Sequence, residues 1–398
     1  MTIFLALLPA YILSIFYRSF LSVIANPVMT DLGIGPRELG FLGAAWFITF
    51  ALAQFPVGWA LDRLGPRRTV AVTMAIGSAG AFLFATATHA VTGTLGMAMI
   101  GLGCSPIFMS ALFLFARTQD PKRFGFLTSV FIGLGSIGNL VGAAPLAIAA
   151  ARFGWRPSML VMAGCFLAAA VFAAALVRDP PRAKAASGGH EGLLKGLRSI
   201  LVLRPLWLLA PITVTGYAIV ATVRGLWIAP FMSDVHGYDA IASGHVATVM
   251  ALTMIAGAFL YGGLEQRLGR SKPLVLWGTG LTALCFIALA LWGNTHAALA
   301  IGLFALIGAT GFTYAVLMAH ARLFFPEHLI GRGMTCINFL FIAGAAAIQS
   351  GSGWFIAEQR QAGLDAATTF AHLHWGFAAL LLVPSAIYAF TPERPVRA

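Results

Sequence analysis

The clearest fold signal in this chain is the stretch Gly58-Trp59-Ala60-Leu61-Asp62-Arg63-Leu64-Gly65-Pro66-Arg67-Arg68. It joins two apolar stretches and holds two glycines, one acid and three arginines. Glycine permits a tight turn and close helix approach, and arginines stay at a membrane interface. Asp62 is a hydrogen-bond acceptor that can lie at the positive end of a neighbouring helix dipole. The pattern predicts a short polar connection between two membrane-spanning helices.

The composition of the whole chain indicates a membrane protein. Of the 398 residues, 59% are hydrophobic and 10% are charged, whereas a soluble domain has about 25% charged residues. This excludes a soluble enzyme, a disordered chain and nucleic-acid binding through a water-exposed basic face. Twelve apolar stretches have the length of a membrane-spanning helix, about 20 residues. They are residues 3–27, 38–60, 69–87, 92–117, 125–150, 156–177, 206–232, 242–264, 273–293, 296–321, 333–357 and 371–390.

One polar segment and the basic residues predict the domains and the topology. We expect a six-helix half at 1–177, a cytoplasmic linker at 178–204, a second six-helix half at 205–390 and a cytoplasmic tail at 391–398. Most of the 25 Lys and Arg residues fall on the side of the linker and the termini. Since cytoplasmic connections are enriched in Lys and Arg, we expect both termini in the cytoplasm. The chain is then a multi-pass protein of the plasma (inner) membrane, and its net charge of +12 requires no nucleic-acid partner.

The two predicted halves repeat at an offset near 204 residues. Pro27-Val-Met-Thr-Asp31 matches Pro230-Phe-Met-Ser-Asp234, and Arg63-Leu-Gly65 matches Arg267-Leu-Gly269. Such a parallel repeat places a substrate site between the halves and favours alternating access.

The chain resembles the major facilitator superfamily in three features. These are the internal repeat, the 58–68 stretch and the sequence Phe153-Gly154-Trp155-Arg156. The resemblance implies an all-α membrane protein with twelve transmembrane helices in two pseudo-symmetric six-helix halves. It also implies a conformational latch on the cytoplasmic side, formed by Gly58, Asp62, Arg63, Gly65, Arg67 and Arg68. Gln266 takes the place of Asp62 in the second copy, so we expect one latch to be stronger than the other.

Two arginines lie inside apolar stretches, Arg18 and Arg224, and no acid lies at mid-helix. An arginine at the bilayer centre costs at least about 2.5–3.5 kcal/mol, and guanidinium matches carboxylate and phosphate oxygens in pairs. Each arginine has a tyrosine seven residues earlier, Tyr11 and Tyr217, which predicts one shared helix face. We therefore predict that Arg18 and Arg224 clamp an anion in a site shaped by Tyr11, Tyr217 and Trp227. Snorkelling to the interface and structural ties across the bundle are the alternatives.

The stretch from Tyr17-Arg18 to Leu32-Gly33 also resembles the organic-anion branch of that superfamily, which includes anion:cation symporters and organophosphate:phosphate antiporters. The resemblance implies secondary active or facilitative transport of a small anionic solute, a carboxylate, phosphate ester or inorganic anion. Those symporters often have Asp-Arg where this chain has Tyr17-Arg18. Coupling to a proton, through the substrate or His320, or to a counter-anion therefore stays open.

Other functions remain as alternatives. Met250, Met254, Met318, His245 and His320 are soft ligands that would suit copper, so a transporter of copper or another metal is one alternative. A drug or metabolite exporter and a non-transporting membrane receptor are the others. No Gly-x-Ser-x-Gly, phosphate-binding loop or paired carboxylates occur in the sequence. We expect no enzyme, no cofactor and no metal site, and a monomer in the lipid bilayer.

Overall fold

The computed structural model describes residues 2–118, 127, 130–177, 179, 204–325 and 330–393. Every regular element in these ranges is a helix, and ten helices within them are long and apolar enough to cross a membrane. The prediction of an all-helical membrane protein is confirmed, while the count of twelve helices in two halves stays a prediction. The predicted linker and tail lie outside the described residues except for 179, 204 and 391–393.

Backbone contacts divide the chain into two compact units. The first unit comprises Met1–Arg182, Arg224–Thr248 and Gln349–Gln361, and the second comprises Ala183–Val223, Val249–Ile348 and Ala362–Ala398. The boundaries of these units differ from the predicted halves, because two segments of the predicted second half pack within the first unit. The division into halves stays a prediction.

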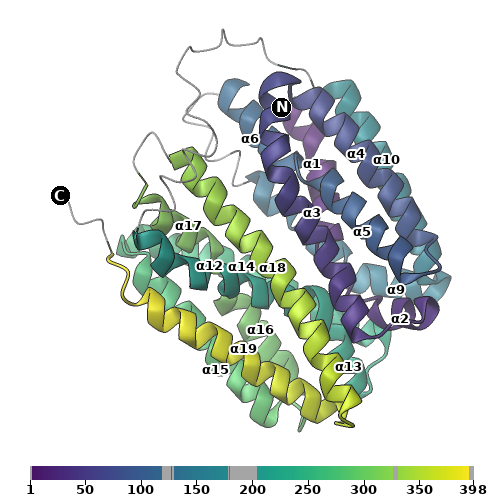
Figure 1. The fold of residues 1–398 in the computed structure, drawn as a ribbon, viewed down its shortest axis with the longest axis vertical. Helices are drawn as coiled ribbons and strands as arrows, with labels where there is room; N and C mark the ends of the chain where they lie inside the picture. The colour runs from purple at the N-terminus through teal and green to yellow at the C-terminus, as the bar shows by residue number, and fades with distance from the viewer. Residues whose placement is uncertain are drawn as a thin grey trace. The chain divides into compact units, whose positions relative to one another are not determined.

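The first unit is built around α3, α4, α5 and α10, which run side by side (Figure 1). The helices α4 and α5 approach closely through small residues. A Cβ added at Gly103 would lie 2.5 Å from the Cα of Gly77, so only glycine fits at this crossing. The bounds are α1 (Thr2–Tyr17), α2 (Ala25–Leu32), α3 (Pro36–Arg63), α4 (Pro66–Ala85), α5 (Ala90–Cys104), α6 (Ile107–Thr118), α8 (Ile137–Val141), α9 (Ala144–Phe153), α10 (Trp155–Leu176) and α13 (Ile228–His236).

Three helical stretches of the first unit are irregular just before a proline. The ring of a proline clashes with the carbonyl four residues earlier, and proline has no N–H to bond it. Pro27 lies near the start of α2, after the gap that follows α1. Pro145 lies near the start of α9, after the gap that follows α8. Pro230 follows η1 (Val223–Trp227), a π-helical turn. The irregular segments therefore have a common physical cause.

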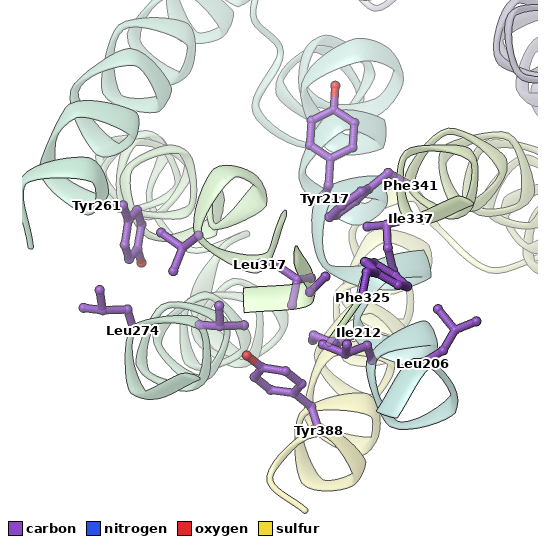
Figure 2. Close-up of a cluster of buried hydrophobic side chains, with 14 residues drawn as sticks. Leu206, Ile212, Tyr217, Tyr261, Leu274, Leu317, Phe325, Ile337, Phe341 and Tyr388 are labelled. Atoms are coloured by element: carbon purple, nitrogen blue, oxygen red, sulfur yellow. The ribbon is translucent and has the colours of Figure 1, made fainter. Parts of the chain in front are cut away.

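The second unit has its own apolar core, drawn in Figure 2. Side chains of α12 and α19, such as Ile212 and Tyr388, are fully buried there with Leu317 of α17. Within this unit α15 contacts both α16 and α19. The bounds are α12 (Arg204–Thr222), α14 (Ala240–Leu268), α15 (Lys272–Trp292), α16 (Ala297–Gly311), α17 (Tyr314–Arg322), α18 (Ile330–Gln361) and α19 (Ala366–Tyr388).

Candidate functional site

The two predicted clamp residues both lie in irregular backbone of the first unit. Arg18 directly follows the end of α1, and Arg224 is the second residue of the π-helical turn η1. At membrane depth, irregular backbone is tolerated only where it is buried in protein or lines a cavity. The shared-face prediction assumed continuous helices from Tyr11 to Arg18 and from Tyr217 to Arg224. The structure has no such helices, because each one changes its geometry near the arginine.

The irregular segments satisfy each other's backbone polar groups. The amide of Ser22 donates to the carbonyl of Gly225 at 2.9 Å. The hydroxyl of Ser22 donates to the carbonyl of Arg224, also at 2.9 Å. A Cβ added at Gly225 would lie only 3.4 Å from the carbonyl oxygen of Arg18. The segments that carry the two arginines are thus in direct contact.

The Arg224 side chain is tied to two backbone carbonyls. It is 2% exposed. Its Nη1 donates to the carbonyl of Ser19 at 3.5 Å, and its Nη2 donates to the carbonyl of Asn139. Oδ1 of Asn139 in turn accepts from the Ser19 hydroxyl at 3.0 Å. Structural ties across the bundle were one of the alternatives to an anion clamp. The hydrogen bonds of Arg224 are ties of this kind.

Both carbonyls bound by Arg224 belong to interrupted helices. In a continuous helix the N–H four residues later would occupy each of them. Here the amide of Val23 bonds to Phe20, and the amide of Ala143 bonds to Leu140. The prolines that interrupt the helices therefore release the acceptors that hold the guanidinium.

The Arg18 guanidinium has different neighbours. Its central carbon lies 5.3 Å from the ring centroid of Trp46 and 5.7 Å from that of Phe50, both on α3. Cation–π contacts of this kind contribute about 0.5–2 kcal/mol, with the larger values at desolvated sites. Gln54 follows Phe50 by four residues and is also buried. The structure therefore brings the two arginine segments together and directs the two guanidinium groups to different partners.

Two other predicted site residues lie in the first unit. The Tyr11 ring stacks on Phe131 at 4.7 Å and on Phe108 at 5.4 Å. The indole N–H of Trp227 donates to the hydroxyl of Ser352 on α18 at 2.8 Å. Both side chains are almost completely buried in apolar or hydrogen-bonded surroundings.

Tyr217 belongs to the second unit. Its ring lies 5.6 Å from Tyr314 and 6.2 Å from Phe341. Figure 2 shows the Tyr217 hydroxyl pointing away from the apolar cluster that its ring covers. The ring of Tyr217 therefore packs on the core, and its hydroxyl points away from the core.

The predicted latch stretch forms a tight turn. Gly65 has φ +86° and ψ 161°, a conformation essentially restricted to glycine. The Arg67 amide donates to Oδ1 of Asp179 at 2.8 Å, and its Nε donates to the carbonyl of Ala174 at 2.8 Å. The turn is thereby attached to the end of α10.

The remaining latch residues make fewer contacts. The Arg63 guanidinium lies 5.6 Å from the ring of Trp59, and Arg68 is exposed. Within the described residues, no atom lies within 4 Å of a Cβ added at Gly58. The side chain of Asp62 lies outside the described residues.

An equivalent capping arrangement occurs in the second unit. Oε1 of Glu393 accepts from the amides of Ser271 and Lys272 at 2.9 and 3.3 Å. A carboxylate at a helix N-terminus is stabilised by the helix dipole. Neither of the capping acids, Asp179 and Glu393, was predicted from the sequence. Their signal is an acid beside a proline after the last apolar stretch of each half.

Two ion pairs repeat at the bundle end where α3 begins. Asp31 accepts from Arg156 at 3.3 Å, and Asp234 accepts from Arg360 at 2.6 Å. The acids are 203 positions apart and the arginines 204 positions apart, which is the offset of the internal repeat. Asn26 donates to the hydroxyl of Ser233 at 2.9 Å and so links α2 to α13.

The soft side chains proposed for copper have other neighbours. Nδ1 of His320 lies 2.6 Å from the Tyr388 hydroxyl, and Nε2 lies 3.2 Å from the carbonyl of Pro392. Met250 packs where α14 crosses Gly308 of α16. His320 and Met250 therefore have the contacts of core residues, whereas His245 is exposed.

Comparison with known proteins places this geometry in a family. A family model for the Major Facilitator Superfamily matches residues 7–350 and 214–397. The chain is 25% identical over 268 residues to the uncharacterized transporter YybO of Bacillus subtilis (strain 168), with 63% of this chain and 61% of that protein covered. It is 23% identical over 350 residues to a D-galactonate transporter of Escherichia coli O6:H1 (strain CFT073), with 74% and 80% covered.

A solved structure shares the fold. A bacterial homolog to the human lysosomal transporter Spinster, in an inward-facing and unoccupied conformation, has a TM-score of 0.78 and 18% identity, with 100% of this chain and 98% of that chain covered. The match to YybO spans about three fifths of that relative. The three proteins named here are described as transporters, in agreement with the prediction that the chain is not an enzyme.

Proposed function

Because the chain belongs to the Major Facilitator Superfamily, we propose that it is a secondary active or facilitative transporter of a small anionic solute that works by alternating access. The observation that carries this proposal is the contact between two irregular segments that each hold an intramembrane arginine. Broken helices of this kind form substrate sites near the bilayer midplane in transporters. D-galactonate, named for one relative, is a sugar carboxylate, which agrees with an anionic solute.

The bonds of Arg224 suggest how an anion would act on it. The carbonyls of Ser19 and Asn139 are neutral acceptors, whereas an anion adds charge–charge attraction to its hydrogen bonds with the guanidinium. An anion that reached Arg224 would therefore replace the carbonyls of Ser19 and Asn139. That exchange would release the tie among α1, α8 and η1, and so couple binding to movement.

Arg18 plays a different part in the proposal. Its guanidinium lies against Trp46 and Phe50, and the planar fork of this group suits an oxyanion. Tyr11 and Trp227, which belong to the same unit as the two arginines, shape the site in this proposal, and the role of Tyr217 stays a sequence-based prediction. The termini lie in the cytoplasm, the protein acts as a monomer, and the 58–68 stretch acts as a latch of the cytoplasmic side.

The proposal is tested first by ligand-induced stabilisation of the purified protein. The probes are carboxylates, sulfonates, phosphates, nitrate, amino acids, sugars and copper, each at the same ionic strength. An anion present at 100 times its dissociation constant stabilises the folded state by about 2.7 kcal/mol. Stabilisation by copper and by no anion would overturn the proposal in favour of metal transport.

Arginine variants then separate an anion ligand from a structural tie. Arg224→Gln keeps an N–H donor for the carbonyls and removes the charge. We expect it to fold with nearly the wild-type midpoint and to lose the stabilisation by the anion. Arg152→Gln, at an exposed residue of α9, is the matched control and should keep that stabilisation.

Uptake into proteoliposomes of the anion found in the screen completes the test. Arg18→Lys and Arg224→Lys keep the charge and lose the planar fork, so we expect uptake to fall about ten- to hundredfold, the equivalent of one hydrogen bond to a charged group. Wild-type rates in both variants would refute the clamp. Binding without any uptake by the wild type would make the protein a receptor.

A further inference from the structure

The first unit has a second concave feature, away from the two arginines. It is an open groove of about 820 Å³ at the bundle end where α3 and α5 begin. One wall is the first turns of α3, with Arg37 and Phe41. Another is α5 from Ala90 to Ala98, and the third is formed by α18 residues that include Trp354. All three walls belong to the same compact unit.

The groove opens to the surroundings of the bundle. Val91 is 78% exposed, and Phe41 and Trp354 are each 52% exposed. Both α5 and α18 contribute candidate membrane spans. Exposed apolar side chains on helices of this kind suit contact with lipid, because lipid is the apolar surrounding of a membrane-crossing helix.

Helix contacts order the lining residues by depth. Gly353 packs against the carbonyl of Pro36, which places Trp354 and Arg37 at the same level, the mouth of the groove. Along α5, Ala98 lies eight residues below Ala90, or about 12 Å. One leaflet of the hydrocarbon core is about 15 Å thick. The groove therefore extends through most of one leaflet.

The chemistry of the lining changes in the same order. Arg37 at the mouth is exposed and cationic. The carboxylate of its neighbour Glu38 accepts from the amide of Gly35 at 3.0 Å, so it caps its own helix. The hydroxyls of Thr94 and Ser350 belong to the lining below the mouth, and the deeper lining residues Leu95 and Ala98 are apolar. From the mouth downward, the lining thus changes from a cation to hydroxyl-bearing residues and then to apolar side chains. This order matches the phosphate, the ester region and the acyl chain of a phospholipid.

We propose that this groove binds one anionic phospholipid from the adjacent leaflet. The phosphate is held by Arg37, the ester region lies at Thr94 and Ser350, and an acyl chain follows Phe41 and Leu95 down to Ala98. The groove involves neither intramembrane arginine, so this inference stands or falls separately from anion transport.

The test is native mass spectrometry of the purified full chain in detergent. The added lipids are phosphatidylglycerol, which is anionic, and phosphatidylcholine, which is zwitterionic. We expect the wild type to retain one phosphatidylglycerol and little phosphatidylcholine. Arg37→Gln should lower the bound phosphatidylglycerol about fivefold, the effect of one arginine at an anionic headgroup. Arg152→Gln, which removes another exposed arginine outside the groove, should leave it unchanged.

A second variant tests the acyl part of the site. Ala98→Phe fills the deep end of the groove without any change in charge, and should lower binding of phosphatidylglycerol while the protein stays monodisperse. Unchanged binding in Arg37→Gln would overturn the proposal, as would an equal loss in Arg152→Gln. Unchanged binding in both Ala98→Phe and Leu95→Trp would show that the lipid lies elsewhere.

Discussion

Gly65 in the signature turn allows a quantitative test of why that turn needs glycine. Its φ of +86° and ψ of 161° lie in a region where other residues are strained by about 1–3 kcal/mol. A Cβ at this position would also stand 2.7 Å from the carboxylate of Asp179. Gly65→Ala therefore strains the turn and displaces the acid that caps α4.

The expected cost of Gly65→Ala has two parts. The backbone strain is about 1–3 kcal/mol. Loss of the bond from the Arg67 amide to Asp179 adds about 1 kcal/mol, toward the lower end of the capping range because Asp179 is exposed. The total is about 2–4 kcal/mol. Since unfolding entropy is about 2.1 cal/mol/K per residue, a chain of 398 residues should lose about 2–5 °C in its midpoint.

The internal repeat supplies the matched control. Gly269 corresponds to Gly65, has φ +61°, and has no atom within 4 Å of an added Cβ. Gly269→Ala should cost only the left-handed strain of about 1–2 kcal/mol. The gain from a stiffer unfolded chain is common to both variants and cancels in the comparison.

The assay is the midpoint of thermal unfolding in detergent, followed by loss of the monodisperse peak. We expect Gly65→Ala to be clearly less stable than Gly269→Ala. In an Asp179→Ala background, where the clash and the cap are already gone, Gly65→Ala should cost about 1 kcal/mol less than in the wild type. This account of the turn would be refuted by two results together. The two glycine variants would have equal unfolding midpoints, and Gly65→Ala would cost the same in the wild type and in the Asp179→Ala background.

Two further predictions concern the repeated ion pairs and the latch. Arg360→Gln removes a pair with Asp234 whose side chains are 36% and 24% exposed, so it should cost only about 0.5–1 kcal/mol and the loss should shrink at high salt. Arg156→Gln should cost more, because that guanidinium also donates to two backbone carbonyls and lies 4.4 Å from the Trp155 ring; equal midpoints would contradict this. Asp62→Asn should change labelling of cysteines placed on the predicted cytoplasmic side more than it changes the affinity for the anion, and unaltered labelling would count against the latch.

The fold was predictable because its signals are long and redundant. Composition, the apolar stretches and the 58–68 stretch each indicate a membrane transporter fold, and an error of a few residues in any stretch leaves that conclusion unchanged. The turn at Gly65 was also predictable, because only one residue type suits it. Glycine permits a close helix approach without requiring it, so Gly58 by itself predicted no particular contact.

The geometry at the arginines was not predicted, although its signal was present. Pro27 and Pro230 were recognised as repeat partners, but a proline also implies a break about four residues before it. The first break is a seven-residue gap, Arg18–Ile24, and the second is a five-residue π-helical turn. The two arginines also lie at different distances from their prolines, because Arg18 is nine residues before Pro27 and Arg224 is six before Pro230.

Side-chain partners were beyond sequence reasoning because they depend on distances between helices. The pairs Asp31–Arg156 and Asp234–Arg360 show what the repeat could have contributed. A contact in one half of a repeat is expected between the equivalent residues of the other half. Two acids about 204 residues apart and two arginines 204 residues apart therefore suggest that each acid pairs with one of the arginines. The capping acids Asp179 and Glu393 escaped because the connections that carry them differ in length between the halves.

The two intramembrane arginines are therefore unequal, although the sequence presents them as a pair. Arg224 is 2% exposed and donates to carbonyls released by two broken helices, whereas Arg18 is half-buried against aromatic rings. The carbonyls of Ser19 and Asn139 are neutral acceptors, and an anion that replaced them would add charge–charge attraction to its bonds with the buried guanidinium. On this argument Arg18 determines whether an anion enters, and Arg224 determines whether its binding opens the contact between the segments. We therefore expect Arg224→Gln to lose the stabilisation by the anion and the movement coupled to it, whereas Arg18→Gln should slow the entry of the anion.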